Sequence, residues 1–229
     1  MTDAARPGVS VVIPARNEAP TVAAIIEKAW AVADEIVVVD GHSTDQTAEI
    51  ARQAGAVVVQ DNKRGKGDAI RVGARAATRD VIVFMDADGS HDVADIPKLL
   101  APIFEEGADL VIGSRGRGGS DELHGDIEKL LRLVGSDIIL IGINWRFKAD
   151  LTDSQNGFRA IRRKVILDLN LKEDITTIEQ EMTIKALKKG YTVAEVPAHE
   201  YARITGESTI RLRKVWFRYV YSFLKYLFF

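Results

Sequence analysis

The stretch from residue 81 to residue 92 constrains the fold of this 229-residue chain more than any other. Five apolar residues, Val81 to Met85, run without a break into the acids Asp86, Asp88 and Asp92. An apolar run rich in β-branched and aromatic residues suits a strand that is covered on both faces, as in a parallel sheet. Such sheets bind ligands beyond the carboxyl ends of their strands, so we expect a site at Asp86 and Asp88.

The acids after this strand predict a divalent cation. Asp86 and Asp88 supply hard anionic oxygens, and Ser90 and His91 lie beside them. This pattern predicts Mg²⁺ or Mn²⁺ on Asp86 and Asp88, with His91 either as a further ligand or, as we favour, in support of the ligands. The ion would also hold the phosphates of a substrate, although a solvated acidic turn gives a similar pattern. A calcium loop is excluded because His91 and Pro97 occupy the positions of its glycine and glutamate. The first motif of haloacid-dehalogenase-type phosphatases also has this form, so a phosphatase is a competing hypothesis.

The composition narrows the class of protein. With 46% hydrophobic residues the chain can bury one sizeable core, and its net charge of -2 gives no general attraction to nucleic acid. The lack of cysteine excludes disulfides, zinc-thiolate sites and thiol nucleophiles. Residues 1–8 are polar and contain no apolar core of the kind found in signal peptides, so we expect the protein on the cytoplasmic side of the membrane.

The first half of the chain alternates strands with helices. Strands are expected at residues 9–15, 36–39, 57–59, 81–85 and 108–113, with helices between them. This order predicts an α/β fold with a mostly parallel central sheet, helices on both faces and right-handed crossovers. The polar residues at 14–18, 40, 86–88 and 114–115 all follow strands, so the fold would gather them at one edge of the sheet.

The second half is less regular. Residues 116–125 form a glycine-rich polar segment that we expect to be a loop able to close over a ligand. The apolar segment 138–147 is shorter than the roughly 20 residues that span a bilayer, so it predicts a core or interfacial helix. Beyond it we expect a polar turn at 153–159 that leads into a strand, a helix at 176–189 and a strand at 191–196. The chain contains neither a P-loop nor a dinucleotide-binding fingerprint.

Five motifs carry a resemblance to a known family: VVIPARNE (11–18), VDGHSTD (39–45), GKG (65–67), DAD (86–88) and NGFR (156–159). Together they resemble family 2 glycosyltransferases with the GT-A fold. Within that family the chain looks most like the dolichyl- or polyprenyl-phosphate sugar synthases, such as dolichol-phosphate mannose synthase. The resemblance covers about residues 9–208. It implies an inverting transfer of a sugar from a nucleotide-diphosphate sugar, GDP-mannose or a UDP-sugar, to dolichyl or polyprenyl phosphate.

The resemblance also implies roles for individual residues. The nucleotide-sugar site would consist of Pro14, Arg16, Glu18, Asp40, Lys66, Asp68, Asp86, Ala87, Asp88 and Arg203. The acceptor site would consist of Arg115, Arg117, Arg132, Asp153, Gln155 and Ser208. Asp88, Arg115 and Arg203 would act in catalysis, the two arginines by stabilising phosphate charge. The chain departs from the family pattern at Ser90, at Asn156 in place of a serine, and at Thr209 in place of a lysine whose charge Arg211 or Arg213 would have to supply.

Three alternatives remain. A GT-A transferase that acts on a saccharide or small-molecule hydroxyl would need a carboxylate base, for which Asp153 and Glu181 are the candidates. A non-catalytic nucleotide-sugar-binding membrane protein would not need to retain Asp86, Asp88 and the cationic residues. A phosphatase would need a second acidic pair after a later strand, which the sequence does not provide, and it leaves the first three motifs unexplained.

The carboxyl-terminal segment, residues 210–229, is set apart from the predicted transferase domain at residues 1–209. It holds half of the aromatic residues of the chain, together with five lysines and arginines. Such a composition predicts an amphipathic helix that lies in the membrane interface, here on the cytoplasmic face as a peripheral attachment. The alternative is that its aromatic side chains pack on the domain itself or on a partner subunit. The sequence does not indicate an oligomeric state.

Overall fold

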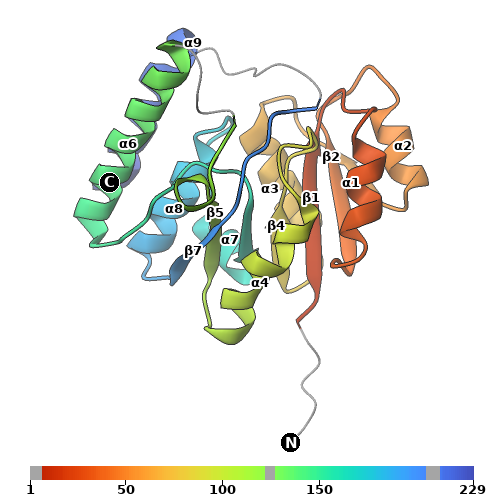
Figure 1. Ribbon diagram of the computed structural model, residues 1–229, viewed down its shortest axis with the longest axis horizontal. Coiled ribbons are helices and arrows are strands. Elements are labelled where there is room, and N and C mark those ends of the chain that lie inside the picture. The colour runs from red at the N-terminus through yellow and green to blue at the C-terminus, as the bar shows by residue number, and fades with distance from the viewer. Residues whose placement is uncertain (1–6, 122–126, 205–211) are drawn as a thin grey trace, which may run out of the picture.

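The computed structural model describes residues 7–121, 127–204 and 212–229, without the side chains of residues 127–132 and 212–216. A seven-stranded sheet lies between two layers of helices, and a pair of helices stands outside these layers (Figure 1). The strands are β1 (Val9–Ala15), β2 (Glu35–Asp40), β3 (Val57–Gln60), β4 (Val81–Phe84), β5 (Leu110–Ser114), β6 (Arg159–Arg162) and β7 (Val193–Pro197). The α-helices are α1 (Val22–Ala29), α2 (Thr47–Gln53), α3 (Lys66–Ala76), α4 (Ile96–Glu105), α5 (Arg115–Gly118), α6 (Ile127–Phe147), α7 (Arg163–Leu169), α8 (Ile178–Lys188) and α9 (Leu212–Phe228).

The sheet confirms the predicted fold class, an α/β fold with a mostly parallel central sheet. The strand order is β3-β2-β1-β4-β6-β5-β7, and all neighbouring strands are parallel except where β6 pairs with β4 and β5. β6 is antiparallel and lies between β4 and β5, which is the exception that a mostly parallel sheet allows. Its four residues include only Ala160 and Ile161 as apolar positions, too few to indicate a central strand.

The core lies on both faces of the sheet because successive side chains of a strand point to opposite sides. Val11 and Ile13 of β1 pack in one buried cluster with residues of α1 and α4. Val12, between them, packs in a second cluster on the other face with residues of α3 and α8. A Cβ atom at Gly73 of α3 would lie 2.4 Å from Val12, so glycine allows this helix to approach the sheet closely.

The helix pair α6 and α9 forms a third cluster at one end of the molecule. Ile139 and Ile143 of α6 are buried together with Phe223 and Leu227 of α9. A Cβ atom at Gly142 would lie 2.4 Å from the Phe223 ring, which accounts for the glycine in this apolar segment. One face of the carboxyl-terminal helix therefore packs on the protein itself. Among the helices of the described residues, none has the length and apolar character needed to cross a membrane.

The segment predicted to be an open glycine-rich loop is partly anchored. It begins with the single-turn helix α5, and a Cβ atom at Gly118 would lie 2.3 Å from the backbone oxygen of Ala198. The backbone N–H of Asp121 donates to Glu200 O at 2.8 Å, next to an isolated bridge between Ser120 and Glu200. The expectation of a loop at 116–125 was wrong for residues 116–118, which belong to α5, and residues 122–126 lie outside the described part of the chain.

Candidate active site

The parallel strands bring the predicted polar residues to one edge of the sheet. Strands β1, β2, β4 and β5 point the same way, so the residues that follow them converge although they are far apart in the sequence. This edge also receives the first residue of α3 and the turn that precedes β6. The convergence expected from the sequence is therefore present.

Lys66, Asp86 and Glu179 form the first charged cluster at this edge. Lys66 Nζ lies 2.7 Å from Asp86 Oδ1, 2.8 Å from Asp86 Oδ2 and 3.5 Å from Glu179 Oε1. Burial favours a lower pKa for Lys66, but the two carboxylates outweigh it and raise that pKa. Burial likewise opposes ionisation of Asp86, yet Lys66 and His91 hold the pKa of Asp86 below its usual value. Glu179 is enclosed more completely, and burial raises its pKa.

Asp88 forms a second cluster with Ser90 and Arg203. Asp88 Oδ1 accepts hydrogen bonds from the Ser90 backbone N–H at 3.0 Å and from Ser90 Oγ at 2.6 Å. Asp88 Oδ2 lies 3.3 Å from Arg203 Nη1. Gly89 makes this turn possible because its φ of +79° is one that glycine adopts without strain. The structure thus brings Arg203, from near the end of the chain, onto the acidic turn after β4.

The segment that carries Arg203 is held to the acidic turn by the backbone. Tyr201 N–H donates to Ser90 O at 2.9 Å, and Ile204 N–H donates to Asp88 O at 3.0 Å. The predicted acceptor residue Ser208 lies outside the described residues, as do Thr209 and Arg211. The side chains of Arg213 and of the predicted acceptor residue Arg132 are also not described.

His91 holds the turn after β4 through contacts with Ser90, Asn156 and Phe158. Its Nδ1 lies 3.1 Å from Ser90 Oγ, its Nε2 lies 3.0 Å from Asn156 Oδ1, and its ring meets Phe158 edge-on at 4.9 Å. Burial lowers the pKa of His91. Both ring nitrogens have protein partners, which favours the supporting role of His91 over direct metal coordination.

Arg115 and Asp153 form a two-pronged ion pair beyond β5. Arg115 Nε donates to Asp153 Oδ2 at 2.6 Å and Nη2 donates to Oδ1 at 3.1 Å, while Nη1 lies 3.5 Å from Glu200. Asp153 also accepts from the backbone N–H groups of Gln155 and Asn156. Burial opposes ionisation, but Arg115 holds the pKa of Asp153 below its usual value. Arg117, more exposed, lies 3.3 Å from Glu195.

Neither carboxylate suggested as a general base is available for that task. Asp153 is engaged by Arg115 and the backbone, as described above. Glu181 is buried, accepts hydrogen bonds from the backbone N–H groups of Lys172 and Glu173, and lies 2.6 Å from Lys185 Nζ. Both side chains therefore hold loops in place, and the suggestion that either acts as a base is corrected.

The predicted nucleotide side of the site surrounds Asp40. Asp40 is buried, accepts from the Ser43 N–H at 3.1 Å and lies 3.4 Å from Gln60 Nε2. Pro14 and Glu18 are half-buried, whereas Arg16 is exposed. Ala87 is fixed through its backbone oxygen, which accepts from Thr21 Oγ1 at 2.6 Å.

Asp68 differs from the prediction. Its carboxylate accepts from Asn62 N–H at 2.7 Å and Asn62 Nδ2 at 3.1 Å, and it lies 3.2 Å from Arg71. Burial would raise its pKa, but these contacts lower it. Asp68 thus fastens the loop before α3, and its carboxylate is already satisfied within the protein.

Three residues of the site have roles that we did not assign from the sequence. Glu179 faces Lys66, a contact that the sequence did not predict. Asn156 accepts from Phe158 N–H, donates to Gly113 O at 2.6 Å and meets His91, so it joins β5 to the acidic turn. Arg159 is fully buried and donates to Asn156 O at 2.9 Å and Glu179 O at 3.1 Å. Burial lowers the pKa of Arg159 to about 10. The signal available in the sequence for Arg159 was its place at the end of the polar turn 153–159.

The residues fit a divalent cation that binds together with a phosphate ligand. Across the described part of the chain, no group of three or more His, Cys, Asp and Glu side chains is placed to hold a metal ion. Asp86 and Asp88 offer two carboxylates, and Mg²⁺ is commonly bound by one or two carboxylates together with substrate phosphates and water. The protein thus supplies part of a coordination shell that a diphosphate would complete.

Comparisons with known proteins agree with this geometry. The model of the family "Glycosyl transferase family 2" matches residues 10–169. Glycosyltransferase AglJ of Haloferax volcanii is 36% identical over 206 residues, which cover 88% of this chain and 65% of AglJ. The dolichyl-phosphate hexose transferase of the same organism is 30% identical over 213 residues, 92% of this chain and 90% of that protein. The dolichol-phosphate mannosyltransferase of Pyrococcus furiosus is 32% identical over 231 residues, 95% of this chain and 64% of that protein.

A solved structure resembles the fold over nearly the whole chain. Glucosyl-3-phosphoglycerate synthase from Mycobacterium tuberculosis, in complex with Mn²⁺, UDP and glucosyl-3-phosphoglycerate, superposes with a TM-score of 0.74. The match covers 96% of this chain and 80% of the other, at 23% sequence identity. At this identity the similarity establishes the α/β fold of these enzymes. The present chain spans about two thirds of AglJ and of the P. furiosus protein, and nine tenths of the hexose transferase.

Proposed function

This chain belongs to glycosyl transferase family 2, and from that premise we propose that it transfers a sugar from a nucleotide-diphosphate sugar to a polyprenyl or dolichyl phosphate, with inversion at the anomeric carbon. Two relatives that are at least 30% identical are named for transfer to, or from, a dolichol-linked phosphate. The observation that carries the choice of a lipid acceptor is the exposed apolar surface on α6 and α9.

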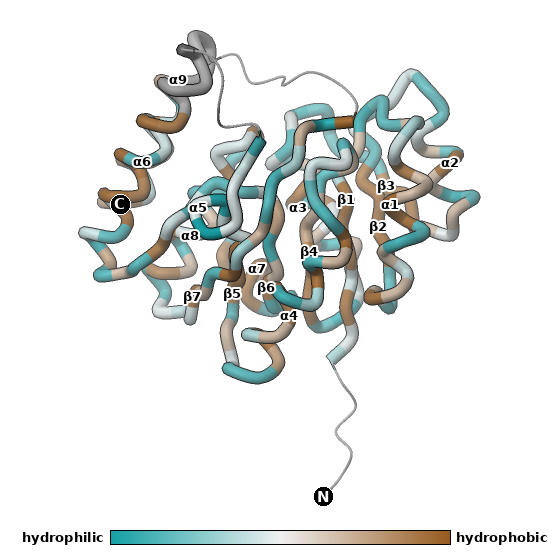
Figure 2. Tube along the Cα trace, in the orientation of Figure 1, coloured by the Kyte–Doolittle hydropathy of each residue, from teal (hydrophilic) through white to brown (hydrophobic). Residues whose placement is uncertain are grey.

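We call this region the α6–α9 surface. It is defined by the exposed large apolar side chains of α6, of α9 and of the last residue: Val134, Ile138, Ile141, Trp145, Phe217, Val220, Tyr221, Leu224, Phe228 and Phe229. Trp145 is 74% exposed and Phe229 95% exposed. Figure 2 shows apolar residues along α6 at the end of the molecule, away from the sheet. A large exposed apolar surface marks a contact with a membrane or with another protein.

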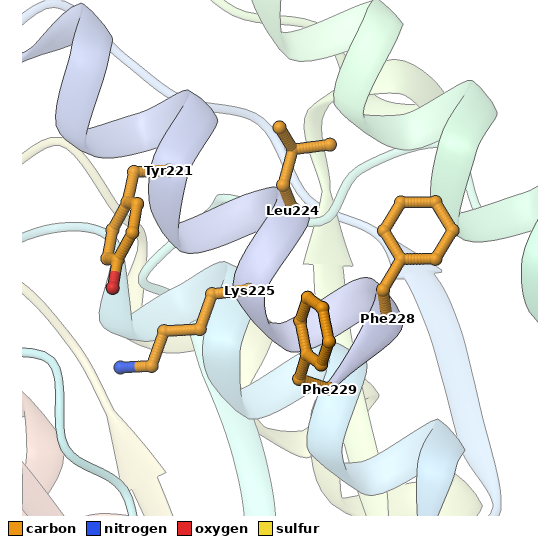
Figure 3. A pocket seen from close by; sticks show the side chains of 5 residues that line it. All are labelled: Tyr221, Leu224, Lys225, Phe228 and Phe229. Carbon is orange, nitrogen blue, oxygen red and sulfur yellow. The ribbon is translucent and has the colours of Figure 1, made fainter.

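The end of α9 has the chemistry of a membrane-interface helix. Tyr221, Leu224, Phe228 and Phe229 surround an open pocket together with Lys225 (Figure 3). The Lys225 ammonium lies 4.6 Å from the centre of the Tyr226 ring, and both Lys225 and Arg218 are partly exposed. Aromatic rings sit at headgroup depth and cations meet anionic lipid. We propose that residues 210–229 and α6 together attach the enzyme peripherally to the cytoplasmic face of a membrane.

This attachment would present the site to a lipid phosphate. α9 packs against α8, and the first turn of α8 carries Glu179 beside Lys66. A polyprenyl phosphate keeps its tail in the bilayer and its phosphate at the surface. An acceptor phosphate is already ionised near neutral pH, so it needs less help from a base than a sugar hydroxyl does. The engagement of both Asp153 and Glu181 within the protein favours this acceptor over a hydroxyl.

We propose the following roles for the site. Asp86 and Asp88 would hold Mg²⁺ or Mn²⁺ with the donor diphosphate, and the ion would supply positive charge to the leaving group. Lys66 and Arg203 add fixed positive charge at the same place, while Asp40 accepts from the base or ribose. Arg115, oriented by Asp153, would contact the acceptor phosphate, with Arg117 on the exposed side. The acceptor oxygen then displaces the diphosphate directly.

The transfer is tested by incubating the protein with each of several GDP- and UDP-sugars, polyprenyl phosphate in vesicles, and Mg²⁺ or Mn²⁺, followed by mass analysis of the lipids. One donor should yield a glycosyl phosphoryl lipid. Soluble saccharides and 3-phosphoglycerate serve as competing acceptors. Sugar transfer to a soluble acceptor without any lipid product would contradict the proposal.

The attachment is tested separately by flotation with anionic vesicles. Ile141→Ser, on the α6–α9 surface, should reduce the floating fraction several-fold. Leu167→Ser is the matched control because Leu167 is also an exposed apolar residue, 42% exposed, but lies on α7. Equal flotation of the two variants would show that the membrane contact lies elsewhere.

A further inference from the structure

The pairing of Lys66 with Asp86 has a consequence for how ligands enter the site. We propose that Lys66 occupies the cation position on Asp86 in the ligand-free enzyme. Metal then binds Asp86 only when a nucleotide diphosphate draws the Lys66 ammonium away. Glu179 keeps the ammonium within the site during this exchange. This inference rests on the proposed use of a nucleotide-diphosphate donor and goes beyond it.

In the Lys66–Asp86 pair, the ammonium contacts both oxygens of the carboxylate. The Lys66 ammonium lies within 2.8 Å of both oxygens of Asp86, so it covers the side of the carboxylate on which a cation would bind. Both side chains are 24% exposed, so a ligand from solvent can reach them. The two positive charges of a divalent cation would repel an ammonium held at the same carboxylate. Lys66 and the ion therefore compete for Asp86.

Two carboxylates and two cations meet where the metal and the diphosphate would bind, with buried Glu179 as a third acid beside Lys66. The carboxylates of Asp86 and Asp88 face the cations Lys66 and Arg203. A divalent cation alone would make this site strongly positive, and a diphosphate alone would make it strongly negative. The two together leave the balance nearly unchanged, so each should strengthen the binding of the other.

Glu179 and Gly157 limit where the ammonium can go. Glu179 Oε1 lies 3.5 Å from Lys66 Nζ, and the Glu179 side chain is only 2% exposed, so it offers a second counter-charge that solvent does not screen well. A Cβ atom at Gly157 would lie 2.8 Å from Nζ, so the ammonium rests directly against the turn before β6. When Asp86 turns to a metal, Lys66 retains Glu179 and can reach a diphosphate by rotation of its own side chain. Glu179 is thus a positioning residue for Lys66.

The experiment measures Mn²⁺ binding by electron paramagnetic resonance of the free ion, with no sugar transfer involved. Titrations are made without nucleotide and with saturating UDP or GDP. In the wild type, the nucleotide that binds better should tighten Mn²⁺ binding by about tenfold or more. Lys66→Met should tighten nucleotide-free Mn²⁺ binding by about tenfold, because Asp86 is then open, and should reduce the effect of the nucleotide. Glu179→Gln should weaken Mn²⁺ binding in the presence of nucleotide, because Lys66 then remains on Asp86.

Lys189→Met is the matched control. Lys189 Nζ also lies 2.7 Å from a carboxylate, that of Asp168, but this pair is exposed at the far end of α8. The control should bind Mn²⁺ as the wild type does in both titrations. Equal Mn²⁺ affinity of the wild type with and without nucleotide would overturn the proposal, as would unchanged nucleotide-free affinity in Lys66→Met. A protein that shows the exchange but forms no glycosyl lipid would refute the proposed acceptor and leave the exchange intact.

Discussion

Substitution of Gly157 by alanine should impair catalysis while leaving the fold intact. A Cβ atom at this position would lie 2.8 Å from Lys66 Nζ, 3.5 Å from Asp86 Oδ2 and 3.7 Å from Glu179 Oε1. The methyl group would therefore enter the junction of the three side chains. Gly157 does not have a positive φ, so alanine causes no backbone strain of its own.

The size of the effect follows from these distances. Ordinary contacts between such atoms are about 3.5 Å or longer, so the ammonium must retreat by roughly 0.7 Å or more. A displacement of about 1 Å in a group that positions a substrate can cost about 100-fold in rate, which corresponds to about 2.7 kcal/mol. The end of a lysine side chain is flexible, so we expect the free energy of unfolding to change by less than about 1 kcal/mol. Loss of a glycine from the unfolded chain offsets part of that change.

The assay compares the turnover number for glycosyl lipid formation and the thermal midpoint of unfolding. Gly135→Ala is the control, because no atom lies within 4 Å of its added Cβ and α6 tolerates alanine well. The control should keep wild-type turnover. Full turnover in Gly157→Ala with an unchanged midpoint would refute the placement of Lys66 at the reacting diphosphate. A fall in turnover matched by a large fall in the midpoint would refute the expectation that the effect is local.

Further expected outcomes concern the metal, the leaving group, pH and the membrane. Asp88→Asn should remove most turnover without unfolding the protein, and wild-type activity should disappear in excess chelator and return with Mn²⁺ or Mg²⁺; turnover that survives the chelator would exclude a metal role. Arg203→Ala should lower the turnover number more than it raises the donor KM if Arg203 acts on the departing diphosphate, and a change in KM alone would assign it to ground-state binding. Burial opposes ionisation of Asp153, but Arg115 lowers the pKa of Asp153 below the unfolded value of about 3.9. The ionised Asp153 therefore stabilises the fold above that pH, and this stabilisation is lost as the pH falls through the folded pKa. Denaturant titrations of Asp153→Asn should show a shallower loss of stability below about pH 4 than the wild type. Truncation after Thr209 should release the protein from anionic vesicles and lower activity on long-chain acceptors more than on short soluble ones, whereas unchanged flotation would place the contact outside residues 210–229.

The predicted strands at residues 9–15 and 81–85 correspond closely to β1 and β4, and the expected sheet edge with its polar residues is present. An unbroken apolar run indicates a strand that is buried on both faces, and such a run can be recognised in the sequence itself. A strand after the turn at 153–159 was expected, and β6 is that strand, but its central, antiparallel place in the sheet was not predicted. The helix α7 was missed because its short segment has no clear period. The carboxyl-terminal helix packs Phe223 on the protein, as the second alternative expected, whereas its membrane contact stays a prediction.

Sequence alone determined the family, the α/β class and the identity of the acids after β4, because motifs and strand periods are local properties of the chain. Tertiary structure decided which of those side chains are already engaged in hydrogen bonds or ion pairs within the protein. The pairing of Arg115 with Asp153 and of His91 with Asn156 joins residues from separate elements. Glu179 meets Lys66 only because α8 is packed against the sheet beside the start of α3. Charge balance in a buried site depends on distances between elements, and only the folded chain fixes those distances.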